Sequence, residues 1–212
     1  MDALPTALRI AELLASRLCH DLAGPLGTVS AALELAEDDA GPNGEARALA
    51  AEAADVAVKR LRLLRAAWGP AASRKIPEIR TLAGALERPN LTVVIDGRDS
   101  IVPAVMARLL LNAALLAAES LPRGGRIGIS GESRAGFLVE IDGPRAAWHA
   151  ELARDLVDAG YALAALEVPE PESARALQAP LTALFAHVDS LRIAMLLPAG
   201  SERAAPLLLQ AR

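Results

Sequence analysis

Aromatic residues are scarce, with two Trp, one Tyr and two Phe among 212 residues. Proteins that hold single-stranded nucleic acid stack bases on aromatic side chains, and membrane barrels carry aromatic girdles, so neither class is supported. The formal net charge of −4 also disfavours non-specific binding to a phosphate backbone. We therefore expect no nucleic-acid partner.

Cysteine is almost absent, because Cys19 is the one thiol in the chain. A single thiol excludes an intrachain disulfide framework and a zinc site built from several cysteines. His149 and His187 have no histidine, cysteine or carboxylate partners at the spacing of metal ligands. The sequence therefore predicts no metal site.

Long apolar runs are also missing. The longest uncharged apolar run covers residues 109–118, which is short of the roughly 20 residues that a membrane-spanning helix needs. The first residues carry no basic segment of the kind that opens a signal peptide. We expect a cytoplasmic protein with no membrane partner.

Apolar side chains at helical spacing dominate the first third of the chain, which predicts helices over 6–38 and 45–68. Pro25 is expected to kink the first helix. A short polar turn between two long helices favours an antiparallel hairpin. Because a lone hairpin cannot bury both apolar faces, we expect a homodimeric four-helix bundle with Trp68 in its core.

The pattern changes after residues 69–73, where glycine, proline and serine gather. Beyond this boundary the sequence predicts short strands and helices in mixed order. Expected helices are 77–87, 101–120, 146–159 and 180–187, and expected strands are 91–95, 126–130, 137–141, 191–197 and 206–209, with a loop over 167–172. Helices on one face of a largely antiparallel sheet make an α+β sandwich. The predicted domains are residues 1–70 and 75–212.

The segment 16–26 carries the most chemical information. His20 lies about 200° around the helix from Leu18, so it is expected to face solvent. Asp21 can accept the Nδ1–H of the imidazole, which leaves Nε2 unprotonated and nucleophilic. On the same face, Arg17 can hold an anion, while the small residues Ser16 and Gly24 leave room for a partner.

An isolated exposed histidine is usually an ordinary surface residue, so the surrounding pattern decides the interpretation. His20 is followed by Asp21, Leu22 and, after two residues, Pro25 and Leu26. This pattern on an amphipathic helix resembles the H-box of sensor histidine kinases. The resemblance implies that His20 accepts and donates a phosphoryl group.

The second half of the chain resembles a degenerate Bergerat-type ATP-binding domain. Asn112 matches the Mg-coordinating Asn of that family, although Arg108 stands where another Asn is usual. Asp142 begins a box that has lost its glycine spacing, and residues 177–181 lack the glycines that let backbone wrap a triphosphate. We therefore expect no ATP. Asn112 and Asp142 are interpreted as remnants of a nucleotide site, or as a helix-surface and a turn residue.

Over nearly its whole length the chain is similar to the ChpT-type histidine phosphotransferases of alphaproteobacteria. The likeness lies in the run 16–21 with Pro25 and Gly27, and in 121–125. It implies a homodimer that takes a phosphoryl group from the receiver domain of a hybrid histidine kinase. The group then passes to receiver domains of response regulators that control the cell cycle, with Mg²⁺ supplied by the partner. Gly24 departs from the family, where Ser is frequent.

Two other functions stay open at this point. One is an ATP-binding histidine kinase that uses Asn112, and the other is a non-catalytic dimeric docking module in which His20 is idle. The basic second helix, with Lys59, Arg60, Arg62 and Arg65, is either a solvated face or a rim that steers an acidic receiver toward His20.

Overall fold

A computed structural model describes residues 3–38, 44–167, 177–196 and 204–211. The helical elements are α1 (Ala3–Asp38), α2 (Gly44–Trp68), α3 (Ile76–Ala83), η1 (Gly84–Leu86), α4 (Ala104–Glu119), α5 (Leu152–Asp155), α6 (Ala159–Glu167) and α8 (Gln178–Val188). The strands are β1 (Leu91–Gly97), β2 (Gly125–Glu132), β3 (Gly136–Asp142), β4 (Leu191–Met195) and β5 (Leu207–Ala211). The predicted α+β class is confirmed.

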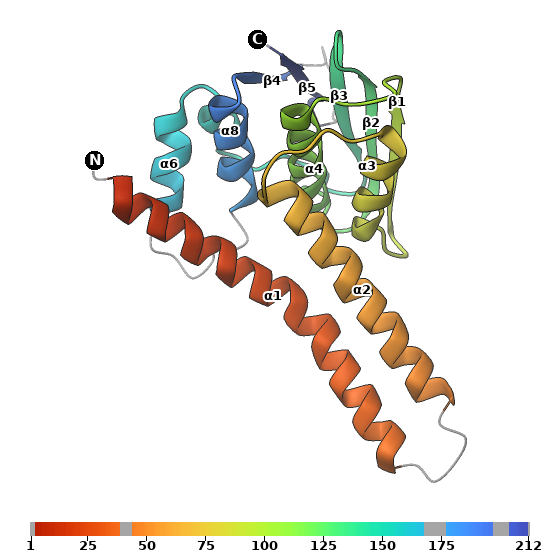
Figure 1. Ribbon diagram of the computed structural model, residues 1–212. Helices are drawn as coiled ribbons and strands as arrows, with labels where there is room; N and C mark the ends of the chain where they lie inside the picture. Colours follow the sequence, from red (N-terminus) through yellow and green to blue (C-terminus); the bar gives the residue numbers. More distant parts are fainter. Residues whose placement is uncertain (1–2, 39–43, 168–176, 197–203, 212) are drawn as a thin grey trace.

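The helical hairpin forms as the sequence predicts, with α1 packed along α2. Small side chains make the contact close, since Ala32 on α1 and Ala50, Ala53 and Ala57 on α2 are buried. Helix α1 continues through Pro25. Figure 1 shows the far half of the hairpin extending beyond the rest of the molecule.

The sheet has the order β1-β2-β3-β5-β4. β1 and β2 are parallel, because α4 connects them, and the other neighbouring strands are antiparallel. α4 packs against β2, β3, α2, α3 and α8. This position explains why α4 is apolar around most of its circumference: a helix surrounded by protein has no solvent-facing side.

The base of the hairpin shares a core with the C-terminal part of the chain. Leu63 and Leu64 of α2 are buried in the same cluster as the inner side chains of the sheet. A second cluster joins Leu13 of α1 to Leu166 of α6. Trp68 was expected in the bundle core, but it is half-buried and packs against both clusters. The hairpin is therefore anchored at its base.

Three predicted helices differ from the structure. The predicted helix 77–87 is divided into α3, which ends at Ala83, and the 3-10 helix η1. The predicted helix 146–159 is wrong: a loop precedes the four-residue α5, and α6 begins only at Ala159. Tertiary contacts override the helical pattern, because buried Trp148 donates from Nε1 to the Ala205 carbonyl at 2.6 Å. The helix predicted over 101–120 starts at Ala104, after Pro103. Of the predicted loop 167–172, only Glu167 lies within the described residues.

Among the described residues, no helix has the length and hydropathy that crossing a membrane requires. The predicted domain boundary at 70–75 coincides with the connection between α2 and α3. A division into two independent domains stays a prediction.

Candidate functional site

His20 projects from α1 into a groove between the hairpin and the C-terminal part of the molecule. Its side chain is 66% exposed. The groove has a volume of about 780 Å³. α1 supplies His20, Asp21 and Gly24, α2 supplies Arg60, and α4 supplies Glu119. The imidazole is therefore open to a partner, as the helical geometry predicts.

Asp21 holds one side of the imidazole. Its Oδ1 atom lies 3.3 Å from His20 Nδ1, while the Asp21 side chain is only 8% exposed. The structure thus brings together the two residues that the sequence pairs. With Nδ1–H directed at a carboxylate, Nε2 is the ring nitrogen left with a free electron pair.

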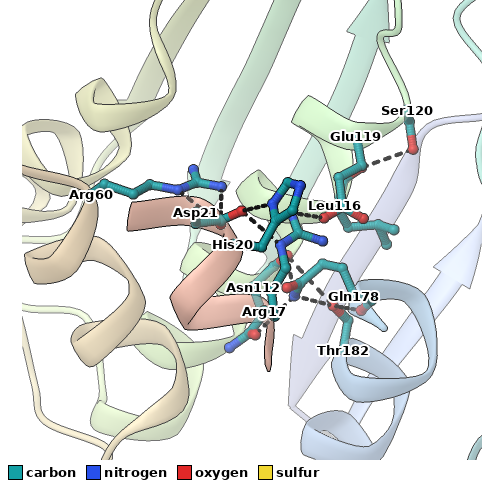
Figure 2. Close-up of polar contacts among 10 residues, drawn as sticks. All are labelled: Arg17, His20, Asp21, Arg60, Asn112, Leu116, Glu119, Ser120, Gln178 and Thr182. Atoms are coloured by element: carbon teal, nitrogen blue, oxygen red, sulfur yellow. Dashed lines mark hydrogen bonds and ion pairs between the residues drawn. The ribbon is translucent and has the colours of Figure 1, made fainter. Parts of the chain in front are cut away.

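Two arginines hold the Asp21 carboxylate in place. Arg17 Nε donates to Oδ1 at 3.0 Å, and Arg60 donates to Oδ2 from Nη2 at 2.7 Å and from Nε at 3.2 Å. Burial alone would raise the pKa of Asp21, but the charges of Arg60 and Arg17 and the hydrogen bonds from Arg60 and His20 lower it below its usual value. Asp21 is therefore a fixed anion beside His20 (Figure 2).

Arg17 does not lie where the sequence predicts it. We expected an exposed guanidinium ready for an incoming anion, but the side chain is only 12% exposed. It bridges Asp21 and Glu119, with Arg17 Nη2 at 2.7 Å from Glu119 Oε1. The position of Arg17 differs from the prediction because α4 brings the Glu119 carboxylate into contact with α1.

Ser16 and Gly24 are both exposed near His20. Apart from the adjacent residues and the backbone of α1, a Cβ atom added at Gly24 would meet no heavy atom within 4 Å, so the surface beside the imidazole is open. Gly24 also precedes Pro25, and a side chain before proline disfavours helical backbone. Glycine at this position therefore helps α1 continue through Pro25.

Two residues of this site were not identified from the sequence in the roles that the structure gives them. Arg60 was grouped with the basic residues of the second helix, yet it is the strongest ligand of Asp21. Glu119 was not singled out at all. It is one of two charged residues in the apolar helix α4, the other being Arg108, and an acidic side chain in an apolar helix was the available signal.

Asn112 is fully buried and its amide is occupied by protein groups. Nδ2 donates to the carbonyls of Ala67 at 2.6 Å and Arg108 at 3.0 Å, and Oδ1 accepts from Gln178 Nε2 at 3.0 Å. Thr182 completes the network by hydrogen bonding to Gln178 (Figure 2). Asn112 is therefore not a helix-surface residue, but its bond to Ala67 caps the last turn of α2, as a residue of a capping network would. In this arrangement its amide does not face a metal–nucleotide complex.

Asp142 is exposed at the end of β3, opposite Arg126 of β2. Arg108, which replaces a family Asn, lies 4.5 Å above the Phe185 ring and pairs with Asp189 at 2.6 Å. These residues do not fit a nucleotide: the amide that would face Mg²⁺ is buried and bonded, and Arg108 is neutralised.

In the described parts of the chain, no three His, Cys, Asp or Glu side chains gather where a metal ion could bind. His187 Nε2 lies 3.0 Å from the Asp155 carbonyl. Cys19 is exposed beside His20.

An exposed histidine on a helical hairpin, with a carboxylate at its Nδ1 atom, is the arrangement expected of a phosphotransfer protein. A family model described as the histidine phosphotransferase C-terminal domain matches residues 77–199. The chain belongs to this histidine phosphotransferase family.

The comparison with curated proteins agrees. The chain is 30% identical to the protein phosphotransferase ChpT of Brucella abortus (strain 2308) over 148 residues, covering 65% of this chain and 69% of that protein. A solved bacterial phosphotransferase has the same fold, with a TM-score of 0.72 and 24% identity over 99% of this chain and 96% of that one.

Proposed function

We propose that this histidine phosphotransferase works in a His–Asp phosphorelay, with His20 as the residue that carries the phosphoryl group. The donor is an aspartyl phosphate on the receiver domain of a hybrid histidine kinase. The acceptors are receiver-domain aspartates of response regulators. The observation that carries this proposal is the exposed imidazole in an open groove, with Nδ1 held by Asp21.

The transfer needs little chemistry from this chain. The free electron pair of His20 Nε2 forms the N–P bond, and the P–O bond to the receiver aspartate breaks, so that the aspartate leaves as a carboxylate with the bonding electrons. The reverse step returns the phosphoryl group to another aspartate. Asp21 stabilises the positive charge that develops on the ring, because its carboxylate stays ionised between Arg17 and Arg60.

No cofactor bound to this chain enters the proposal. We expect Mg²⁺ to arrive with the receiver domain that brings the aspartate. ATP has no place in it, because Asn112 is buried and hydrogen-bonded. The protein should therefore transfer phosphoryl groups and not make them from nucleotide.

A second copy of the chain is proposed as a partner. Leu26 and Leu33 on α1 lie seven residues apart, as do Leu49 and Val56 on α2, and all four are 47–55% exposed. Apolar residues at heptad spacing are typical of helices that pack against other helices. Two hairpins would bury these side chains in a four-helix bundle. A cytoplasmic location fits a protein that meets soluble receiver domains.

The main test incubates the purified protein with a phosphorylated receiver domain and measures acid-labile phosphate on the chain. Wild type should gain phosphate, and His20→Gln should gain none while keeping its dimer mass in sedimentation. Labelling of His20→Gln would exclude this residue as the carrier. An intact dimer that binds receivers but never accepts phosphate would support the docking-module alternative.

The kinase alternative is tested with labelled ATP and no receiver. We expect no phosphate on the chain and no saturable heat in a calorimetric titration with Mg-ATP. Autophosphorylation of His20 would contradict the proposal.

A further inference from the structure

Four charged side chains form a continuous chain across three helices. Arg60 of α2 binds Asp21 of α1, Asp21 binds Arg17, and Arg17 pairs with Glu119 of α4. All four side chains are at most 26% exposed, in contrast to His20 beside them. The C-terminal part of the molecule therefore reaches the phosphoacceptor through an ionic contact.

Glu119 is an unusual residue for its surroundings. It is the last residue of α4, after an apolar stretch that includes Leu115 and Ala118. Its Oε1 atom forms an ion pair with Arg17 Nη2 at 2.7 Å, and its side chain is only 26% exposed. Removing a carboxylate from water costs free energy even when an arginine pairs with it, so packing alone does not explain Glu119.

The contacts of Asp21 suggest what Glu119 does. Asp21 Oδ1 accepts a hydrogen bond from Arg17 Nε and lies 3.3 Å from His20 Nδ1, so these two donors share one oxygen. Glu119 Oε1 pairs with Nη2 of the same guanidinium, on the side that faces α4. The Arg17 charge is then divided between two carboxylates, which leaves Oδ1 a better acceptor for His20.

We propose that Glu119 is a positioning residue for phosphotransfer: by holding Arg17 it keeps Asp21 bound to His20 Nδ1 and so keeps Nε2 free for the phosphoryl group. Glu119 touches neither the imidazole nor the partner in this role. The inference rests on the function proposed above. Through Glu119, the C-terminal part of the chain would influence the reactivity of His20 on the hairpin.

The charge of Glu119 is sensitive to pH near neutrality. Burial raises the pKa of Glu119 to about 7, against the opposing effect of Arg17. The two cavities that Glu119 lines also contain these charged or titratable groups: Arg17, His20 and Asp21 on α1, Arg60 on α2, Glu87 and Arg88 after η1, and Arg145 and His149 after β3. Because these groups also face Glu119, its own contribution is measured as the difference between wild type and a variant that changes Glu119 alone.

Phosphotransfer by wild type and Glu119→Gln should be compared across pH. Gln keeps the size and an acceptor oxygen but loses the charge that attracts Arg17. The two rates should be similar at about pH 6, where Glu119 is largely protonated, and differ by roughly 10-fold at about pH 8. Receiver affinity should stay within about two-fold of wild type, because the 26% exposed Glu119 side chain contributes little surface to the groove and its charge faces Arg17.

Glu87→Gln is the matched control. Glu87 lines the same groove and carries the same charge, but its carboxylate accepts from the Val93 amide. Its rate should stay within about two-fold of wild type at every pH. Equal pH profiles for both variants would mean that only the groove charge matters, and would overturn the positioning role.

A second measurement does not depend on phosphotransfer. Nitrogen-15 spectra of the unphosphorylated protein report which ring nitrogen of His20 carries the proton, with His20→Gln identifying its signals. At about pH 8, wild type should show Nδ1–H, and Glu119→Gln and Glu119→Ala should shift toward a mixture of tautomers. Unchanged His20 signals in folded Glu119 variants would refute the inference. Failure of wild type to accept phosphate, with the tautomer shift present, would instead refute the proposed function alone.

Discussion

His20 and Asn112 lie at two polar sites that differ in how much of the central side chain reaches solvent. Around His20, buried charges support one exposed side chain that faces a groove. Around Asn112, amide and hydroxyl groups satisfy one another, and the side chain has no exposed surface. A polar network that leaves one reactive atom exposed to solvent can support chemistry. A buried network in which all polar groups bond to one another stabilises the fold instead.

The largest effect should come from removing the reactive atom. His20→Gln should lose all detectable phosphate acceptance, since no other side chain of the site presents a free nitrogen lone pair. The fold should be unaffected, because changes at exposed positions alter stability by less than about 0.5 kcal/mol. Acid-labile phosphate and the melting temperature are the two measurements.

Removing the charge beside His20 should have the next largest effect. Asp21→Asn can still bond to the imidazole but no longer stabilises its positive charge, so transfer should slow by about 100-fold. Receiver affinity, measured by calorimetry, should be unchanged. A wild-type rate in Asp21→Asn would mean that Asp21 only neutralises Arg17 and Arg60.

The closed site should respond in the opposite way. Asn112→Ala removes the donor to the buried Ala67 carbonyl and the side-chain bond to Gln178, and leaves a cavity, so it should lower the free energy of unfolding by about 2–4 kcal/mol. Below the melting transition, its transfer rate should equal that of wild type. A selective loss of transfer in a stable Asn112→Ala protein would break the comparison.

Glu119 should make stability depend on pH. Its folded pKa of about 7 lies above the ordinary value of 4.5, so the folded state holds this proton more tightly than the unfolded state. The stabilisation is complete at acid pH and is lost as pH rises to about 7, by at most about 3 kcal/mol. Glu119→Gln should lack this loss. In urea denaturation, the free energy of unfolding of the variant should therefore rise relative to that of wild type between about pH 5 and pH 7. A constant difference across this range would contradict the raised pKa.

Two helix glycines provide the smallest and most local test. At both Gly24 and Gly27, a Cβ would meet no atom beyond the adjacent residues and the backbone of α1. Gly27→Ala should stabilise α1 by about 0.5–1 kcal/mol, since alanine favours helix. Gly24→Ala should gain little or nothing, because its Cβ meets the ring of Pro25. Equal increases in melting temperature for the two variants would show that Pro25 does not disfavour a side chain at position 24.

Local patterns predicted the parts of the molecule that local interactions determine. The hairpin and the strands beginning at Leu91 and Gly125 follow from periodicity and turn residues. Exposure of His20 follows from its angle to Leu18. The helix predicted over 146–159 failed because a long-range bond fixes Trp148, and residues distant in sequence leave no local signal.

The same reason limited the prediction of the site. Asp21 is adjacent to His20 in sequence, so their pairing could be predicted. Arg60 and Glu119 reach Asp21 and Arg17 across helix contacts that depend on the whole fold. Arg17 was therefore assigned to an incoming anion when its partner is a carboxylate of the same chain.

The anchored base of the hairpin has a consequence for how the protein unfolds. Leu63 and Leu64 lie in the core that contains the sheet, and Trp68 contacts both apolar clusters. Melting the sheet therefore removes the packing on which α2 depends, and the two regions should unfold as one cooperative unit. The chain has two tryptophans, Trp68 at this junction and Trp148 beyond β3, so their fluorescence should change in a single transition that coincides with the loss of helical circular dichroism.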